Sequence, residues 1–189
     1  GLGRAHALGL AKQGARVVVN DFGVAADGSG RDESAGRGVV EEIKSMGGEA
    51  VPHFGDVADW NASKGMFETA VSAFGDVNIV VCNAGFLRDG ILFNMSEQDF
   101  DDVVRVHLKG HFAVARFAAE HWRAQAKAGE AVDARIVNTS SGAGLMGSVG
   151  QGAYSAAKAG IAALTLVAAA EMVRYGVTVN AIAPGARTR

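Results

Sequence analysis

The chain has 189 residues, enough for one domain with a sizeable core, and we expect residues 1–189 to form a single domain. Its 18 basic and 20 acidic residues nearly balance, so charge gives no reason to expect a nucleic acid or an anionic membrane as partner. Cys82 is the only cysteine, which excludes an internal disulfide and fits a reducing compartment such as the cytoplasm.

The hydrophobic pattern alternates between a helical period and short apolar runs. A helix is expected over 2–13, ending at Gly14, and the β-branched run that follows predicts a buried strand over 16–20. A polar, glycine-rich loop then occupies 24–33.

The later elements continue this alternation. Apolar stripes closed by Gly47 and Gly75 predict two more helices, and Ser96 with Asp99 resembles a capping box for a third. The helices expected here run through 39–46 and 66–74 and over 96–123 and 152–175. The strands expected here are 49–54, 77–82, 135–139 and 177–183, with a polar connection over 125–133.

Five strands alternate with helices, and most strands are continuous apolar runs. This pattern predicts an α/β protein with a doubly wound parallel sheet, the Rossmann fold. We expect the first strand of that fold to lie before Gly1 and its last strand after Arg189. Because the first strand is central in the order 3-2-1-4-5-6, the strands at 17–19 and 77–82 should flank a slot without bonding to each other.

The opening residues indicate a dinucleotide site. Glycines in Gly1-Leu2-Gly3, directly before a helix, let a pyrophosphate approach the backbone and the positive helix end. Asp21 ends the next strand, roughly 20 residues on, where the fingerprint has an acid for the adenosine ribose. A carboxylate there would repel the 2′-phosphate of NADP, which favours NAD. The alternative is that the glycines form a plain turn and Asp21 begins a loop.

A second group of residues is suited to proton transfer. Tyr154 and Lys158 are four apart, so both lie on one face of a helix, and an ammonium near a phenol favours the phenolate. Such a tyrosine can exchange a proton with an alcohol, and Ser141 could hydrogen-bond the substrate oxygen. Taken singly, each is more often a surface residue or a helix cap.

Together these motifs resemble the short-chain dehydrogenase/reductase family over the whole chain. The matching motifs are Gly1-Leu2-Gly3, Asn83-Ala84-Gly85, Ser141, Tyr154-x-x-x-Lys158 and Pro184-Gly185. The resemblance implies that Tyr154 is the acid/base, that Lys158 tunes it and holds the nicotinamide ribose, and that Ser141 orients the substrate. The cofactor contacts that it implies, beside Tyr154 and Lys158, are Gly1, Leu2, Gly3, Asp21, Asp56, Val57, Asn83, Ala84, Gly85, Pro184, Gly185 and Thr188. No metal is implied.

Two positions depart from the family pattern. His107 stands where the family usually has an asparagine of its catalytic tetrad. It either carries a proton relay or holds the helix backbone open for a water, and a lone helical histidine is most often structural. Cys82 replaces an asparagine and is expected to behave as a small apolar residue.

Within the family the chain is most similar to the (3R)-hydroxyacyl-CoA dehydrogenase domain of the peroxisomal multifunctional enzyme type 2. The resemblance is carried by 19–23, 87–89, 106–110 and 150–154. It implies hydride transfer between NAD(H) and a secondary alcohol or ketone, and the substrate that it suggests is a (3R)-hydroxyacyl thioester. A homodimer or homotetramer is expected, through the helices at 96–123 and 152–175.

Two alternatives remain open. One is an NADPH-dependent 3-oxoacyl carrier-protein reductase, or another ketoreductase, working by the same chemistry. The other, of a different class, is a non-catalytic dinucleotide sensor. Intact Ser141, Tyr154 and Lys158 argue against the sensor, because a sensor needs no such triad.

Overall fold

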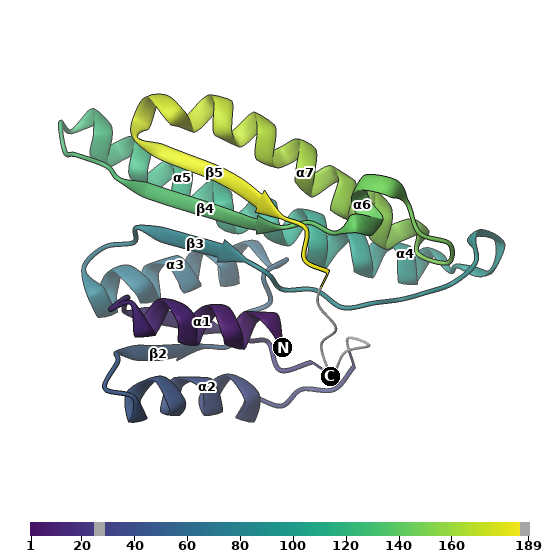
Figure 1. Ribbon diagram of the computed structural model, residues 1–189, viewed down its shortest axis with the longest axis horizontal. Helices are drawn as coiled ribbons and strands as arrows, with labels where there is room; N and C mark the ends of the chain where they lie inside the picture. The colour runs from purple at the N-terminus through teal and green to yellow at the C-terminus, as the bar shows by residue number, and fades with distance from the viewer. Residues whose placement is uncertain (25–28, 186–189) are drawn as a thin grey trace.

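The computed structural model of the chain describes residues 1–24 and 29–185. Helices and parallel strands alternate along this part of the chain (Figure 1). The strands are β1 Val17–Asn20, β2 Ala50–His53, β3 Ile79–Cys82, β4 Ala134–Thr139 and β5 Val177–Ile182. The α-helices are α1 Leu2–Lys12, α2 Ser34–Ser45, α3 Trp60–Phe74, α4 Glu97–Val104, α5 Gly110–Lys127, α6 Gly142–Met146 and α7 Gly152–Met172. The shorter helical segments are η1 Leu92–Asn94, η2 Arg105–Lys109 and η3 Val173–Tyr175.

The strands form two parallel sheets. β1 pairs with β2, from Val17 opposite Ala50 to Asn20 opposite His53, and β3, β4 and β5 pair in that order. Among the described residues β1 and β3 share no ladder, which confirms the expectation that these two strands do not bond to each other. The parallel α/β fold predicted from the sequence is therefore confirmed, with its strands divided between two sheets.

Each sheet has its own apolar core. Around β1 and β2, Val40, Ile43 and Ala50 are buried, and α2 and α3 both pack on this pair of strands. Around the second sheet, α5 and α7 pack on β3, β4 and β5 and bury a larger cluster that includes Trp122 and Ile136. The two halves of the fold are thus stabilised by separate hydrophobic clusters.

The predicted helix at 96–123 is three segments in the structure. Ser96 caps α4 by accepting from the N–H of Asp99 at 3.1 Å, as the capping box predicted. The chain then widens into the π-helical turn η2 before α5 resumes at Gly110. A π turn holds an extra residue, and such turns recur at functional sites. The helix also continues to Lys127, so the polar connection predicted over 125–133 begins at residue 128 in the structure.

Two short elements were not predicted. The 3₁₀ turn η1 lies between β3 and α4, and the five-residue helix α6 lies between β4 and α7. Ser141 is the N-cap of α6, where its Oγ accepts from the N–H of Ala143 at 3.2 Å. Neither segment is long enough to show a helical period in the sequence.

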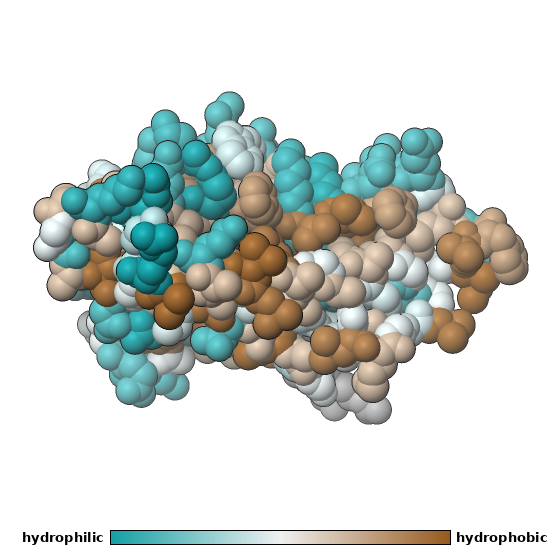
Figure 2. All heavy atoms as spheres, turned by 90° about the horizontal axis from the view of Figure 1, so that it is seen from above, coloured by the Kyte–Doolittle hydropathy of each residue, from teal (hydrophilic) through white to brown (hydrophobic). Residues whose placement is uncertain are grey.

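The long helix α7 combines a buried and an exposed face. Ile161 is fully buried, whereas Leu166, Val167 and Val173 in η3 are 74%, 54% and 65% exposed. Figure 2, seen from above Figure 1, shows apolar residues spread across this side of the molecule. By length and composition alone, Gly152–Tyr175 could cross a membrane. Its packing on α6, β4 and β5 fits instead a helix of a folded core.

Candidate active site

A cavity of about 1490 Å³ lies between the two sheets, along the whole length of the slot between β1 and β3 and beside the loops that follow these strands. Most of the residues singled out from the sequence line it. They are Gly1, Leu2, Gly3, Asp21, Asp56, Val57, Asn83, Ala84, Gly85, His107, Tyr154 and Lys158. The fold therefore brings together residues from both ends of the sequence.

The first turn of α1 meets the end of β3 at one wall of this cavity. Gly1 is the N-cap of α1 and no side chain caps the helix, so backbone N–H groups are left to face a ligand. A Cβ on Gly3 would lie 3.1 Å from Nδ2 of Asn83, which is tighter than most such contacts. Glycine at this position lets the Asn83 amide lie against the helix start.

Asp21 follows β1 directly. Its Oδ1 accepts from the N–H of Gly23 at 2.8 Å, and the carboxylate also lines the cavity. The loop-starting hydrogen bond expected of a plain turn is thus present. It occupies one oxygen, and the other accepts no hydrogen bond from the residues that the structure describes.

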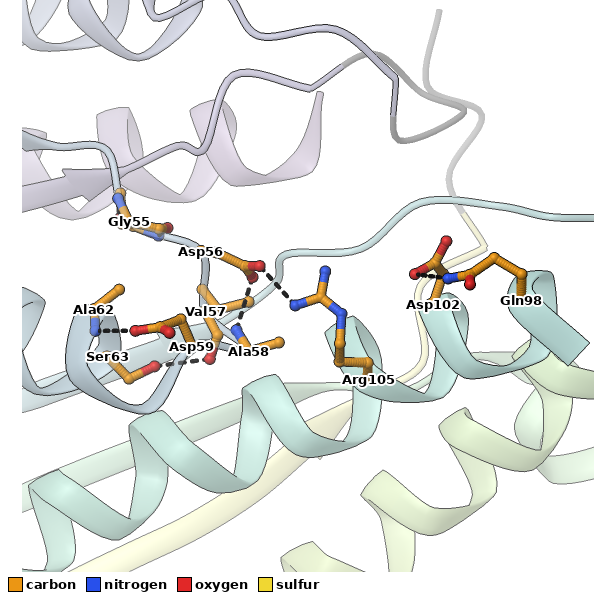
Figure 3. A network of polar contacts seen from close by, with 11 residues as sticks. Gly55, Asp56, Val57, Ala58, Asp59, Ala62, Ser63, Gln98, Asp102 and Arg105 are labelled. Atoms are coloured by element: carbon orange, nitrogen blue, oxygen red, sulfur yellow. Dashed lines mark hydrogen bonds and ion pairs between the residues drawn. The ribbon is translucent and has the colours of Figure 1, made fainter.

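Asp56 and Val57 lie in the loop after β2, held by a network that Figure 3 shows. Oδ2 of Asp56 accepts from Nη1 of Arg105 at 2.6 Å, and its Oδ1 accepts from the N–H of Ala58 at 2.9 Å. The carbonyl of Val57 accepts from Ser63 at 2.7 Å. Both carboxylate oxygens of Asp56 are therefore engaged, and η2 is tied to this loop by an ion pair.

Tyr154 and Lys158 lie one turn apart on α7, as their spacing predicted. The ammonium of Lys158 is 5.5 Å from the centre of the Tyr154 ring and donates to the Thr139 carbonyl at 2.6 Å. Lys158 is only 2% exposed, and this burial lowers its pKa to about 8. A Cβ on Gly144 would lie 2.6 Å from backbone and Cβ atoms of Lys158, so α6 can approach α7 only with glycine here.

His107 lines the cavity and is buried. Its ring meets the Tyr154 ring edge to face, with centroids 5.2 Å apart. Nε2 lies 2.7 Å from the carbonyl oxygen of Phe86 and 3.2 Å from the Phe86 amide nitrogen, so the Phe86 backbone holds this side of the ring. Burial, followed by the charge of Lys158, lowers the pKa of His107 to about 4, so the ring is neutral near pH 7.

Gly85 makes room for this histidine. A Cβ at residue 85 would lie 2.1 Å from Cε1 of His107, far inside any real contact. The glycine of the Asn83-Ala84-Gly85 motif is therefore required by close approach of η2 to the loop after β3, a reason the sequence does not reveal.

Some predicted residues lie apart from the others. Ser141, Pro184 and Gly185 do not line the cavity: Ser141 caps α6, and the other two follow β5. Thr188 lies outside the described residues.

Two residues of the site were not singled out from the sequence. Arg105 holds Asp56, and His111, on the first turn of α5, lines the cavity beside Lys158. The signal for His111 was its spacing of four from His107, which puts both rings on one helical face.

A parallel α/β fold in which a glycine turn, a strand-end carboxylate and a tyrosine paired with a buried lysine face one cavity has the site of a Rossmann-type dinucleotide-binding protein. The family model described as short chain dehydrogenase matches residues 1–188. The chain belongs to the short-chain dehydrogenase/reductase family.

Individual relatives and a solved structure support this family assignment. A crystal structure of a short chain dehydrogenase from Mycobacterium avium matches with a TM-score of 0.93 and 63% identity, over 100% of this chain and 65% of that one. The hydroxyacyl-CoA dehydrogenase ChsB1 of Mycobacterium tuberculosis is 50% identical over 100% of this chain and 58% of its own length. Peroxisomal multifunctional enzyme type 2 of Mus musculus is 42% identical over 100% of this chain and 24% of its own length. The similarity to that enzyme predicted from the sequence is confirmed.

Proposed function

We propose that this chain carries the cofactor site and the acid/base group of an NAD-dependent enzyme that interconverts a secondary alcohol and a ketone. The observation that carries the proposal is the pairing of Tyr154 with a buried Lys158 in the cavity that Gly1-Leu2-Gly3 also lines. An acid/base group and a dinucleotide cradle facing one cavity are what hydride transfer requires.

In alcohol oxidation Tyr154 takes the hydroxyl proton, and in ketone reduction it returns a proton to the oxygen. The Lys158 ammonium favours the phenolate form that the first of these steps needs. Ser141 caps α6 and does not line the cavity; its proposed role, to orient the substrate oxygen, rests on the family pattern. NAD(H), when bound, supplies the site that accepts or donates the hydride.

The residues present fit this cofactor. The uncapped start of α1 offers backbone N–H groups to a pyrophosphate, and Gly3 keeps the wall free of a side chain. Asp21 leaves an oxygen for the ribose hydroxyls and carries a charge that disfavours a 2′-phosphate, which supports NAD over NADP.

A (3R)-hydroxyacyl thioester is the substrate class we propose. Its support is the similarity to two relatives, one named as a hydroxyacyl-CoA dehydrogenase and the other as a peroxisomal multifunctional enzyme type 2. The competing function is that of an NADPH-dependent ketoreductase acting on carrier-protein thioesters.

Turnover tests the proposal. The full-length protein should oxidise (3R)-hydroxyacyl-CoA with NAD, and Tyr154→Phe should lower kcat by at least about a hundredfold, the usual range for a general acid/base, while cofactor binding stays intact. Lys158→Ala should lower both kcat and cofactor affinity. Activity that survives in Tyr154→Phe would refute the acid/base role, and cofactor binding without any turnover would favour the sensor.

We also propose a homo-oligomer formed through α7 and the helix α4–η2–α5. The exposed apolar side chains of Leu166, Val167 and Val173 support this, because such a patch is costly in water and alanine-rich helices approach closely. Light scattering should give a dimer or tetramer for the full-length protein, and Leu166→Asp should dissociate it. A wild-type monomer would exclude the interface.

A further inference from the structure

The ends of β1 and β2 are joined by a side chain as well as by their ladder. The ladder ends with Asn20 opposite His53, and the N–H of Asp21 still donates to the His53 carbonyl at 3.1 Å. Beyond this point the chains separate into two loops, and Asp21 in one and Asp56 in the other both line the cavity. The side chain of Asn20 crosses from the first loop to the second where they separate.

The Asn20 amide pairs with the backbone of Gly55 in both directions. Its Nδ2 donates to the Gly55 carbonyl at 3.1 Å, and its Oδ1 accepts from the Gly55 N–H at 3.1 Å. A residue of a neighbouring strand makes the same pair of hydrogen bonds, so this side chain extends the ladder past its last backbone pair. The amide cannot be turned over, because its NH2 would then face an N–H and its oxygen a carbonyl.

His53 donates to the same amide oxygen. Its Nδ1 lies 2.7 Å from the atom that the Gly55 backbone fixes as Oδ1 of Asn20, so Nδ1 must carry a proton. Burial holds the pKa of His53 below its usual value, so the ring is neutral at neutral pH and its one N–H lies on Nδ1. The Gly55 nitrogen is also 3.2 Å from Nδ1, but a protonated Nδ1 cannot accept from it.

Close packing supports this arrangement. A Cβ at Gly55 would lie 2.5 Å from Cε1 of His53, so the ring can lie against the loop only with glycine there. The other end of the loop is held separately, by the ion pair of Asp56 with Arg105 (Figure 3). The loop after β2 is therefore fixed at both ends before any ligand binds.

We propose that Asn20 and His53, here called the Asn20–His53 clamp, are positioning residues for the adenosine half of the cofactor. Through Gly55 the clamp holds the loops that follow β1 and β2 at a fixed separation. This role rests on the proposed function, in which the cofactor lies against these loops and Asp21 faces its ribose. A site that is already ordered spends less of its binding free energy on ordering loops.

The first test is calorimetric titration of the full-length protein with ADP-ribose, which carries adenosine without nicotinamide. Asn20→Leu is close in size and cannot hydrogen-bond, so ADP-ribose should bind about tenfold more weakly, since both bonds to Gly55 are lost. Asn61→Leu makes the same change at an exposed position of α3 and should leave the affinity at the wild-type value. If Asn20→Leu does not fold, Asn20→Ala takes its place.

His53 is tested by a pair of variants in the same titration. His53→Leu removes one donor and should weaken ADP-ribose by about threefold, the smaller effect expected of one hydrogen bond. His53→Asn can place its Nδ2 where Nδ1 lies and should restore most of the wild-type affinity. A merely structural histidine would change stability in both variants without this difference in affinity.

The second test is turnover at varied NAD. In Asn20→Leu the KM for NAD should rise about tenfold, while kcat at saturating NAD falls less than about twofold, because the clamp acts on binding of the adenosine end and not on proton transfer. Equal loss of kcat and of kcat/KM would overturn the assignment of the clamp to cofactor binding.

The third test needs no altered site. Nitrogen NMR of the wild-type imidazoles at about pH 8, with the His53 signal assigned by its absence in His53→Asn, should show the proton on Nδ1. A proton on Nε2 would put two acceptors 2.7 Å apart and would overturn the clamp.

The outcomes separate this inference from the proposed function. Wild-type ADP-ribose affinity in a folded Asn20→Leu or Asn20→Ala variant overturns the clamp and leaves the enzyme assignment intact. ADP-ribose binding without turnover in the wild type overturns the proposed function, while the affinities of the variants still decide on the clamp. A wild-type protein that does not bind ADP-ribose overturns both.

Discussion

The two sheets contribute to the cavity in different ways. The half built on β1 and β2 offers backbone N–H groups, glycines and carboxylates in partly exposed loops, such as Asp21. The half built on β3, β4 and β5 offers polar side chains that are almost fully buried, among them His107, His111 and Lys158. Binding of a large, flexible cofactor can use loops, whereas proton transfer needs groups whose charge is set by burial.

This contrast predicts that the same substitution should have opposite effects in the two halves. Gly85→Ala places a Cβ 2.1 Å from His107, whereas Gly9→Ala on α1 meets nothing within 4 Å. The first should cost about 2–3 kcal/mol of unfolding free energy and most of the turnover, as overpacking does. The second should stabilise the helix by up to about 1 kcal/mol. Urea denaturation compares them, and equal effects would contradict the close fit of η2.

The buried histidines should also make the catalytic half sensitive to acid. Their pKa values, about 4 for His107 and about 3 for His111, lie below the ordinary 6.5, so the unfolded chain takes up protons first. Stability is therefore complete above about pH 6.5 and falls as the pH drops toward 4, by about 1.4 kcal/mol per pH unit for each histidine. Denaturation midpoints measured across this range check it. His111→Gln should flatten the slope, and an unchanged slope would contradict the burial of a neutral ring.

The cofactor half should respond in selectivity more than in stability. Asp21→Ala removes the carboxylate that we propose faces the cofactor ribose, and it should narrow the proposed preference for NAD over NADP by about tenfold or more, because like charges in one site repel by over 1 kcal/mol. The kcat/KM values for both cofactors measure this. A wild-type preference for NADP would reverse the assignment of Asp21.

The ion pair that joins the two halves should have the smallest effect. Arg105 and Asp56 are both partly exposed, so Arg105→Gln should cost less than about 1 kcal/mol of stability and weaken cofactor binding only a few-fold. The loss should shrink as salt is added. Arg4→Gln, which removes the exposed pair with Glu42, is the matched control. It should change cofactor affinity by no more than the few-fold expected of Arg105→Gln. A large, salt-independent loss would show that Arg105 acts otherwise than through this pair.

The features that the sequence predicted differ in kind from those that it missed. Strands and helices were located from apolar periodicity, and Tyr154 with Lys158 from a spacing of four, because both signals are local in the chain. The π turn η2 was missed since the pattern over 96–123 is that of one continuous helix, and a single extra residue barely alters the period. The position of Ser141 at the cap of α6, outside the cavity lining, depends on a helix too short to leave a pattern.

The clash that makes Gly85 necessary could not be predicted either, because it joins residues far apart in the sequence. The same holds for Nδ1 of His107 and Nε2 of His111, which have no hydrogen-bond partner among the residues that the structure describes. Motifs locate chemical groups, but only packing shows which of them remain unpaired.

The π turn also determines where this helix can change in length. Because η2 holds an extra residue in one wide turn, α4 and α5 keep nearly the same faces toward the core as in a regular helix one residue shorter. Removing one residue from 105–109 would therefore restore a regular helix and leave Val103 of α4 in the core, but it would displace His107, which lies in the middle of η2. Removing one residue from within α5 would instead turn the two parts of the helix by about 100° relative to each other. A helix that looks uniform in the sequence thus has one turn that can lose a residue without losing its core contacts.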